Sequence, residues 1–119
     1  MKLVLIDTSK KEAVVGLVDD QEVVVEKRWQ ADRQLGRELL EKLDEMLGEV
    51  GWKLEELDRV AVHQGPGHYS ALRTGVVTAT MLAESLGKGL VSVDGDNLAK
   101  QIEQVIERDL VEVVKVVYK

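Results

Sequence analysis

The chain has 119 residues, a formal net charge of −6 and a hydrophobic fraction of 45%. Its length predicts one compact domain, and the scarcity of aromatic residues means that the core must be aliphatic. With 22 acidic and 16 basic residues and no cluster of Lys or Arg, the chain is not expected to hold nucleic acid alone, because phosphate contacts supply most non-specific affinity. The absence of cysteine excludes disulfides, thiolate metal ligands and cysteine nucleophiles.

The first third of the chain predicts three strands. Apolar runs at 3–7, 13–18 and 22–26 are separated by clusters of turn-forming residues at 7–9 and 19–21. The short connections favour an antiparallel meander. The N-terminal apolar run is too short for a signal peptide, and no segment has the 18 apolar residues of a membrane helix. We therefore expect a soluble, cytoplasmic protein.

The spacing of apolar residues next predicts a helix that Asp32 opens and that Gly48 and Gly51 end. Charged residues cover its other side. The apolar positions are Leu35, Leu39, Leu40, Leu43, Met46, Leu47 and Val50.

The rest of the chain alternates between strands and helices. We expect strands at 59–62 and 90–93, helices at 70–86 and 96–109, and a final valine-rich strand at 110–118. Asp96 is a candidate N-cap for the third helix. The predicted order is β-β-β-α-β-α-β-α-β in a single α/β domain spanning residues 1–119.

The second predicted helix is almost free of charge. Arg73 and Glu84 are its only charged residues, and the side opposite its apolar stripe is small and uncharged, whereas a surface helix normally carries charges there. This pattern favours a subunit interface, with complete coverage by the first helix as the alternative. The residues of that side include Ser70, Thr74, Val77, Thr78 and Met81.

The Gly-Pro-Gly loop before this helix has two interpretations. It is either a tight strand-to-helix turn or an anion site, but it lacks the Walker and GxGxxG spacings, and Pro66 has no N–H to donate. Ser70 is expected to cap the helix. Asp7, at the end of the first strand, is either a turn-stabilising residue or the best-placed carboxylate for a site. Candidate anion or nucleotide contacts are Asp7, Thr8, Ser9, Gly65, Gly67 and His68.

The sequence predicts no catalytic residue, no metal site and no cofactor. His63 and His68 are five residues apart, which is the wrong spacing for two ligands on one helical face, and no third ligand lies near them in the sequence. No nucleophile is paired with His68.

The segments "LVLIDTS" and "GPGHYSALRTG" resemble the bacterial TsaB (YeaZ) family, the dimerization subunit of the tRNA threonylcarbamoyladenosine machinery. The family patterns are "ILxIDTS" and "GPGSFTGLRIG", and the resemblance covers about residues 1 to 100. The chain departs from the second pattern at residues 68–71 and at residue 74. The matching loop and helix residues are Gly65, Pro66, Gly67, Leu72, Arg73 and Gly75.

The resemblance implies one ribonuclease-H-like lobe of the actin-like ATPase (ASKHA) superfamily. Relatives carry a second lobe, so this is either a natural short form or an excised N-terminal half. Nucleotide binds between two lobes in this superfamily, and the catalytic paralogue TsaD binds metal through histidines on its first-lobe helix. The first helix of this chain has no histidine. The resemblance therefore implies a subunit that is not an enzyme.

The implied function is a non-catalytic scaffold that binds a TsaD-type transferase and, with a TsaE-type ATPase, supports threonylcarbamoyl transfer to adenosine 37 of tRNA. Because the family uses its first two helices for this contact, Leu35, Leu39, Leu43 and Met46 join the expected interface. The resemblance implies only indirect contact with tRNA, no membrane partner, and a homodimer when the chain is alone. The alternatives are a small ATP-binding lobe with weak or no hydrolysis and an unrelated homodimerizing domain.

Overall fold

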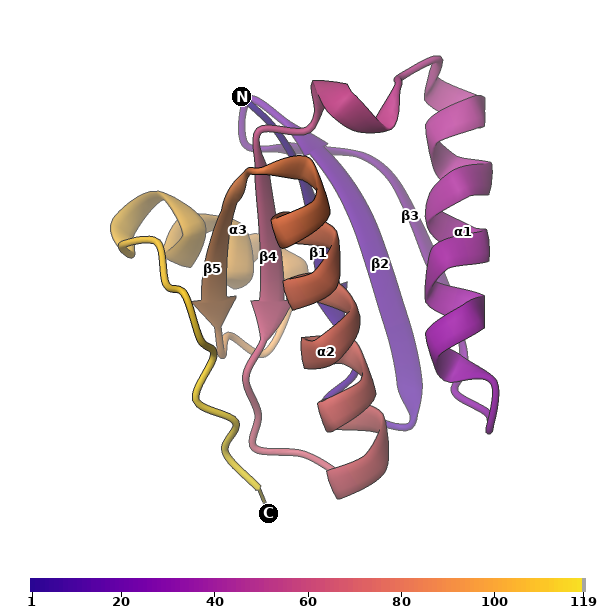
Figure 1. Ribbon diagram of the computed structural model, residues 1–119, viewed down its shortest axis with the longest axis vertical. Coiled ribbons are helices and arrows are strands. Elements are labelled where there is room, and N and C mark those ends of the chain that lie inside the picture. The colour runs from indigo at the N-terminus through magenta and orange to yellow at the C-terminus, as the bar shows by residue number, and fades with distance from the viewer. Residues whose placement is uncertain (119) are drawn as a thin grey trace.

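The computed structural model describes residues 1–118 and contains one mixed five-stranded sheet in the order β3-β2-β1-β4-β5 (Figure 1). The strands β1, β2 and β3 pair antiparallel, and β4 and β5 add to β1 in parallel. This confirms the expected antiparallel meander of the first three strands. The strand bounds are β1 (Lys2–Asp7), β2 (Glu12–Asp19), β3 (Glu22–Gln30), β4 (Arg59–His63) and β5 (Gly89–Val93).

Helices cover both faces of this sheet. The helices α1 (Leu35–Val50) and α2 (Tyr69–Leu86) lie on one face, and α3 (Leu98–Glu107) lies on the other, while a short 3-10 helix (Leu54–Glu56) precedes β4. Side chains alternate along β1, so Val4 and Ile6 join the core under α1 and α2, and Leu3 and Leu5 join the core under α3. The resulting layers are those of one ribonuclease-H-like lobe.

Three predicted helix starts are shifted by one to three residues. The first helix begins at Leu35 rather than Asp32. Asn97 rather than Asp96 caps α3, because its Oδ1 accepts a 3.0 Å hydrogen bond from the backbone N–H of Lys100. Ser70 does not cap α2, since that helix already begins at Tyr69.

The expected ninth strand is wrong. Residues 110–118 form two isolated bridges, with backbone hydrogen bonds from Val111 N to Leu90 O (2.8 Å) and from Val117 N to Gln64 O (2.7 Å). Arg108 fills part of the outer edge of β5 by donating to the carbonyl of Ser92 at 3.0 Å. The segment therefore leaves β5 and runs toward the start of α2 (Figure 1).

This C-terminal segment is part of the core despite its irregular backbone. Val114 is buried in the cluster beneath α1 and α2, and Val111 and Val116 pack against the same cluster.

None of the helices within residues 1–118 has the length and apolar character to cross a bilayer.

Candidate functional site

The α2 helix divides into a side buried on the sheet and an exposed side. Gly75 allows close approach to the sheet, because a Cβ at this position would collide with the side chain of Thr8 just beyond β1. Six residues of α2 are buried, namely Leu72, Gly75, Val76, Ala79, Leu82 and Ala83. The helix is thus seated closely, and the opposite side is left for contacts beyond the sheet.

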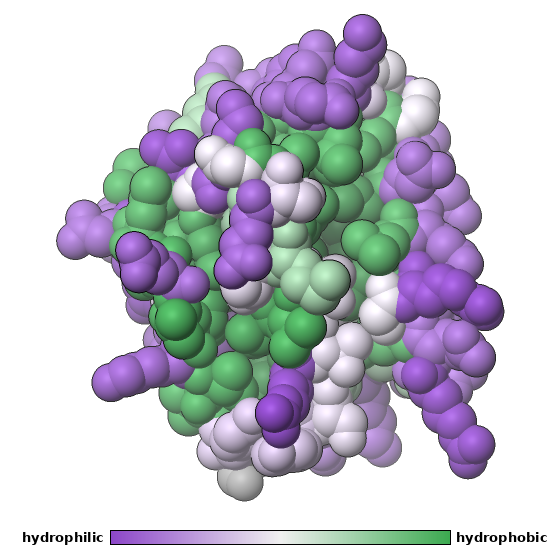
Figure 2. Space-filling model, viewed as in Figure 1, coloured by the Kyte–Doolittle hydropathy of each residue, from purple (hydrophilic) through white to green (hydrophobic). Residues whose placement is uncertain are grey.

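The exposed side of α2 carries large apolar side chains. Val77 is 48% exposed and Met81 is 63% exposed, and Leu40 of the neighbouring α1 is 52% exposed. Figure 2 shows green and white side chains over α2, bordered by purple charged side chains over α1. Exposed apolar side chains gathered on neighbouring helices are typical of an interaction surface.

Two shallow grooves follow the line between α1 and α2, and Thr78 lines both. One has a volume of about 240 Å³ and is lined by Leu40, Thr78, Met81, Leu82 and Ser85. The other, of about 510 Å³, is lined by Gly36, Tyr69, Ser70, Arg73, Thr74, Val77 and Thr78. We call this continuous surface the α1–α2 groove. Its lining has one charged side chain, Arg73, so a partner could cover it with little charge desolvation.

The threonine hydroxyl groups on the exposed side of α2 donate hydrogen bonds to backbone carbonyls of the same helix. Thr74 Oγ1 donates to Ser70 O at 2.9 Å, and Thr78 Oγ1 donates to Thr74 O at 2.8 Å. Because these donors are already used, the threonines present mainly methyl groups outward. The exposed face of α2 is therefore more apolar than its composition indicates. The spacing of Thr74 and Thr78 by four residues is the signal in the sequence from which this could have been inferred.

Part of the predicted interface is incorrect. Leu35, Leu39, Leu43 and Met46 are all buried in the chain's own core and are not available on this surface. The apolar stripe of α1 faces the sheet, and the exposed contribution of α1 to the groove comes from Leu40, which was not among the predicted interface residues. Ser70, Thr74, Val77, Thr78 and Met81 do lie along the groove.

The outward side of α1 is strongly charged and tied to β3. Lys27 of β3 lies 2.8 Å from Glu49 and 3.1 Å from Glu45. Hydrogen bonds to Glu49 and then Glu45 raise the pKa of Lys27 above its ordinary value. These charges limit the apolar surface to the side of α1 that faces α2.

The candidate nucleotide contacts lie at the carboxyl ends of β1 and β4. Asp7 is buried, and its Oδ1 accepts hydrogen bonds from Ser9 N (2.9 Å) and Ser9 Oγ (2.6 Å). Its Oδ2 accepts from Gln101 Nε2 of α3 at 2.9 Å. The carboxylate is fully engaged inside the chain, which agrees with the interpretation of Asp7 as a turn-stabilising residue.

The Gly-Pro-Gly loop is also held by hydrogen bonds within the chain. The Nδ1 of buried His63 accepts a 3.0 Å hydrogen bond from Gly65 N, so its Nε2 carries the proton and donates to Gly95 O at 3.2 Å. Gly67 lies so close to the backbone of Ser9 that a Cβ there would be 2.5 Å from the Ser9 carbonyl oxygen. His63 therefore stabilises the turn.

These residues do not fit an open nucleotide site. Asp7, Thr8 and Ser9 are buried, Gly67 is packed on Ser9, and only His68 of the candidate contacts is exposed as a side chain. Phosphate sites of this kind need free backbone N–H groups and room for the ligand. Across residues 1–118, no three Asp, Glu or His side chains come together as a metal-binding group.

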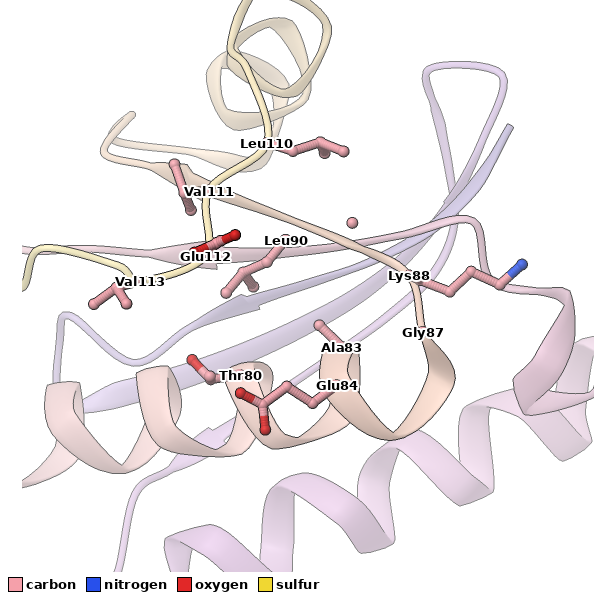
Figure 3. Close-up of a pocket in the computed structure, with 11 residues that line it drawn as sticks. Thr80, Ala83, Glu84, Gly87, Lys88, Leu90, Leu110, Val111, Glu112 and Val113 are labelled. Carbon is pink, nitrogen blue, oxygen red and sulfur yellow. The ribbon is translucent and has the colours of Figure 1, made fainter.

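A larger hollow lies elsewhere, between α2, the start of β5 and residues 110–113 (Figure 3). It has a volume of about 750 Å³, and Ala83, Leu90, Leu110, Val111 and Val113 supply its apolar lining. Lys88 points away from Leu90 and Val111. The hollow exists because the C-terminal segment forms one wall. The hydroxyl group of Thr80 in its lining donates to the backbone carbonyl of Val76 at 2.8 Å.

The fold defines the class of this protein as a single ribonuclease-H-like lobe of the actin-like ATPase superfamily. Within that class, residues 29–111 match the family described as TsaD, tRNA N6-adenosine threonylcarbamoyltransferase. The match covers more than half of the chain, and the protein belongs to this family.

Curated relatives share this description but are much longer. The chain is 32% identical over 109 residues to the tRNA N6-adenosine threonylcarbamoyltransferase of Anaeromyxobacter dehalogenans, covering 78% of this chain and 33% of the relative. It is 40% identical over 63 residues to the enzyme of the same name from Ralstonia pickettii, covering 53% of this chain and 18% of the relative. The chain thus spans a third or less of the length of these relatives.

Solved structures show the same lobe. YeaZ from Pseudomonas aeruginosa superposes with a TM-score of 0.72 at 25% identity, covering 78% of this chain and 43% of that one. RuvC from Thermus thermophilus gives a TM-score of 0.55 at 12% identity, covering 79% and 64%, which indicates a shared fold alone. The likeness to YeaZ agrees with the resemblance of the sequence to the TsaB (YeaZ) family.

Proposed function

We propose that this protein is a non-catalytic, TsaB-like subunit that binds a TsaD-type transferase and supports threonylcarbamoyl transfer to adenosine 37 of tRNA. Membership of the TsaD family and likeness to YeaZ support a role in this tRNA modification. The binding surface is the α1–α2 groove. A TsaE-type ATPase takes part through the complex.

The observation that carries the proposal is the exposure of Val77 and Met81 on a helix face whose one charged side chain is Arg73. Covering these side chains releases water from apolar surface, and each square ångström buried contributes roughly 25 cal/mol. Met81 is unbranched and can adapt to the contours of a partner helix. The internally bonded threonines add apolar contact without leaving unsatisfied hydroxyl groups.

A non-catalytic role is supported by the state of the polar groups near the Gly-Pro-Gly loop. Asp7 and His63 are both buried and hydrogen-bonded within the chain. A general acid or base must reach the reacting group within hydrogen-bond distance, and neither side chain has a free polar atom at the surface. In this proposal the partner supplies the reacting groups, and this chain supplies the surface that holds it.

The test is co-expression of the full chain with a TsaD-type partner, followed by affinity capture and mass spectrometry of nucleosides from tRNA. Met81→Glu and Val77→Arg each place a charge in the groove and are expected to weaken capture about 10-fold or more. Ile106→Glu is the matched control, because Ile106 is also exposed but lies on α3, across the sheet.

The control variant should bind the partner and restore threonylcarbamoyladenosine as the wild type does. Undiminished capture by a Val77→Arg/Met81→Glu double variant would refute the proposed surface. Unchanged modified-nucleoside content in cells lacking this protein would refute the proposed role in tRNA modification.

A further inference from the structure

We propose that Tyr69, Tyr118 and Arg73 form a stacking platform for an unpaired base of single-stranded RNA. The rings of Tyr69 and Tyr118 stack with centroids 4.6 Å apart and an interplanar angle of 25°. Arg73 Nη1 donates a 2.8 Å hydrogen bond to Tyr69 Oη, and the guanidinium carbon lies 5.8 Å from the ring centroid. The three side chains hold one another in a fixed arrangement.

This platform is at the surface rather than in the core. Tyr69 remains 57% exposed and Tyr118 remains 44% exposed although each ring covers part of the other. A stacked aromatic pair normally contributes to a protein core or an interface, because the rings carry large apolar area. Here the pair leaves aromatic surface open to solvent, where a flat π-system can be added.

The C-terminal segment is what brings the second ring into place. Val117 N donates to Gln64 O at 2.7 Å, and Gly67 and Tyr118 form a parallel bridge. Tyr118 is thereby held over the first turn of α2 by backbone hydrogen bonding. The two tyrosines are 49 positions apart in the sequence, so the platform is formed only by the fold.

The charge around the platform suits a polyanion. Residues 60–83 contain no Asp or Glu, and Arg73 lies among them. Lys10 and Lys11 follow Ser9, which contacts Gly67, and Lys115 precedes the anchored Val117 by two positions. Acidic residues gather elsewhere, with five on α1 and three at the β2–β3 turn.

Aromatic rings flanked by basic side chains are the recurring chemistry of single-stranded nucleic acid binding. Bases stack on the rings, and the cations accompany the phosphates. The inference revises the expectation that this chain meets tRNA only indirectly. It does not rest on the proposed binding of a transferase, although Tyr69 and Arg73 also line one end of the α1–α2 groove.

The experiment measures fluorescence anisotropy of a labelled, unstructured RNA of about ten nucleotides, a length within the usual site sizes, at low ionic strength. Tyr69→Ala and Tyr118→Ala are each expected to weaken binding about 5- to 100-fold. Tyr118→Phe should bind as the wild type does, because it keeps the ring. Lys115→Glu, at an exposed position, should weaken binding and reduce its salt dependence.

Three results would overturn the proposal. They are no saturable binding by the wild type, equal binding by the alanine variants, and equal affinity for a blunt RNA duplex. Thermal unfolding of each variant verifies folding, and Lys115→Glu tests the same site if an alanine variant does not fold.

Capture of the transferase partner separates this inference from the proposed function. Tyr118→Ala is expected to lose RNA binding and retain the partner. Loss of the partner with unchanged RNA binding would assign the aromatic pair to a protein interface and overturn the RNA proposal.

Discussion

Gln101 Nε2 donates a 2.9 Å hydrogen bond to Asp7 Oδ2, joining residues 94 positions apart. The same nitrogen donates to Gly95 O at 2.9 Å, so α3 is tied both to the end of β1 and to the loop after β5. The glutamine is buried. This bond occupies the carboxylate that would otherwise be the best-placed acidic group in the chain.

Gln101→Leu should destabilise the fold because it removes one donor from a buried carboxylate. We expect the free energy of unfolding to fall by about 1–3 kcal/mol, the usual cost of an unsatisfied buried group. Urea titration measures the change. Gln34→Leu, at an exposed glutamine before α1, is the control and should have little effect. Equal stability of Gln101→Leu and the wild type would contradict this prediction.

Gly75→Ala should also destabilise the fold, since the added methyl would collide with Thr8. Overpacking of a tight contact typically costs about 1–3 kcal/mol. Adding Thr8→Ala to this variant should recover part of the loss. Gly48→Ala is the matched control on α1, where the space is open, and it should stabilise by about 0.5–1 kcal/mol. Differential scanning calorimetry distinguishes the opposite signs.

The packing of the C-terminal segment is tested at two adjacent valines. Val114 is buried, whereas Val113 is largely exposed. Val114→Ala should lower the free energy of unfolding by about 1–3 kcal/mol, as expected for loss of buried apolar surface. Val113→Ala should leave it almost unchanged. Similar denaturation midpoints for the two variants would mean that the segment is detached in solution.

Self-association through the α1–α2 groove is a further expectation. At rising protein concentration, sedimentation equilibrium of the isolated chain should show a shift from monomer toward dimer. Met81→Glu should shift this equilibrium toward monomer, because it would bury a charge at the contact, while Ile106→Glu should not. A wild type that stays monomeric at every concentration would exclude the homodimer.

A pH dependence is expected at Asp94. Burial acts to raise the pKa of Asp94, but hydrogen bonds from Gln104 and Arg108 outweigh it and hold the pKa below its ordinary value of 3.8. A carboxyl whose pKa is lower in the folded chain contributes stability above the unfolded pKa, and this contribution is lost as pH falls through the folded pKa.

Denaturation of the wild type from neutral to acidic pH, compared with Asp94→Asn, measures this effect. The difference in stability between the two proteins should shrink below pH of about 4. When both proteins also carry Arg108→Gln, the difference in stability that Asp94→Asn causes at neutral pH should be smaller. A difference that is constant with pH would rule out the ionic contribution of Asp94.

Much of the fold was predictable because its signals are local. The first eight elements follow the expected order, since apolar spacing distinguishes strand from helix within a few residues. The last run was wrong because forming a strand there depends on open hydrogen-bonding positions along β5. Arg108 and the packing of Val114 determine that path, and neither can be inferred from the valine-rich composition.

The candidate surface was predicted only in part. The lack of charge on α2 correctly indicated an exposed apolar face, with Val77 and Met81 on it. On α1, apolar periodicity identified the stripe but not its direction, so the residues assigned to the partner are those that bury against the sheet, and Leu40 was missed.

By itself, the sequence determined the α/β class, the succession of strands and helices, the tight turn at Gly65–Gly67 and the uncharged face of α2. Only the tertiary structure decided that Asp7 is bonded to Gln101, that Leu40 rather than Leu39 reaches the groove, and that Tyr118 stacks on Tyr69. The physical reason is the distance along the chain over which each kind of interaction acts. Periodicity and turn chemistry act between near neighbours, whereas these contacts depend on where distant segments meet once the sheet has formed.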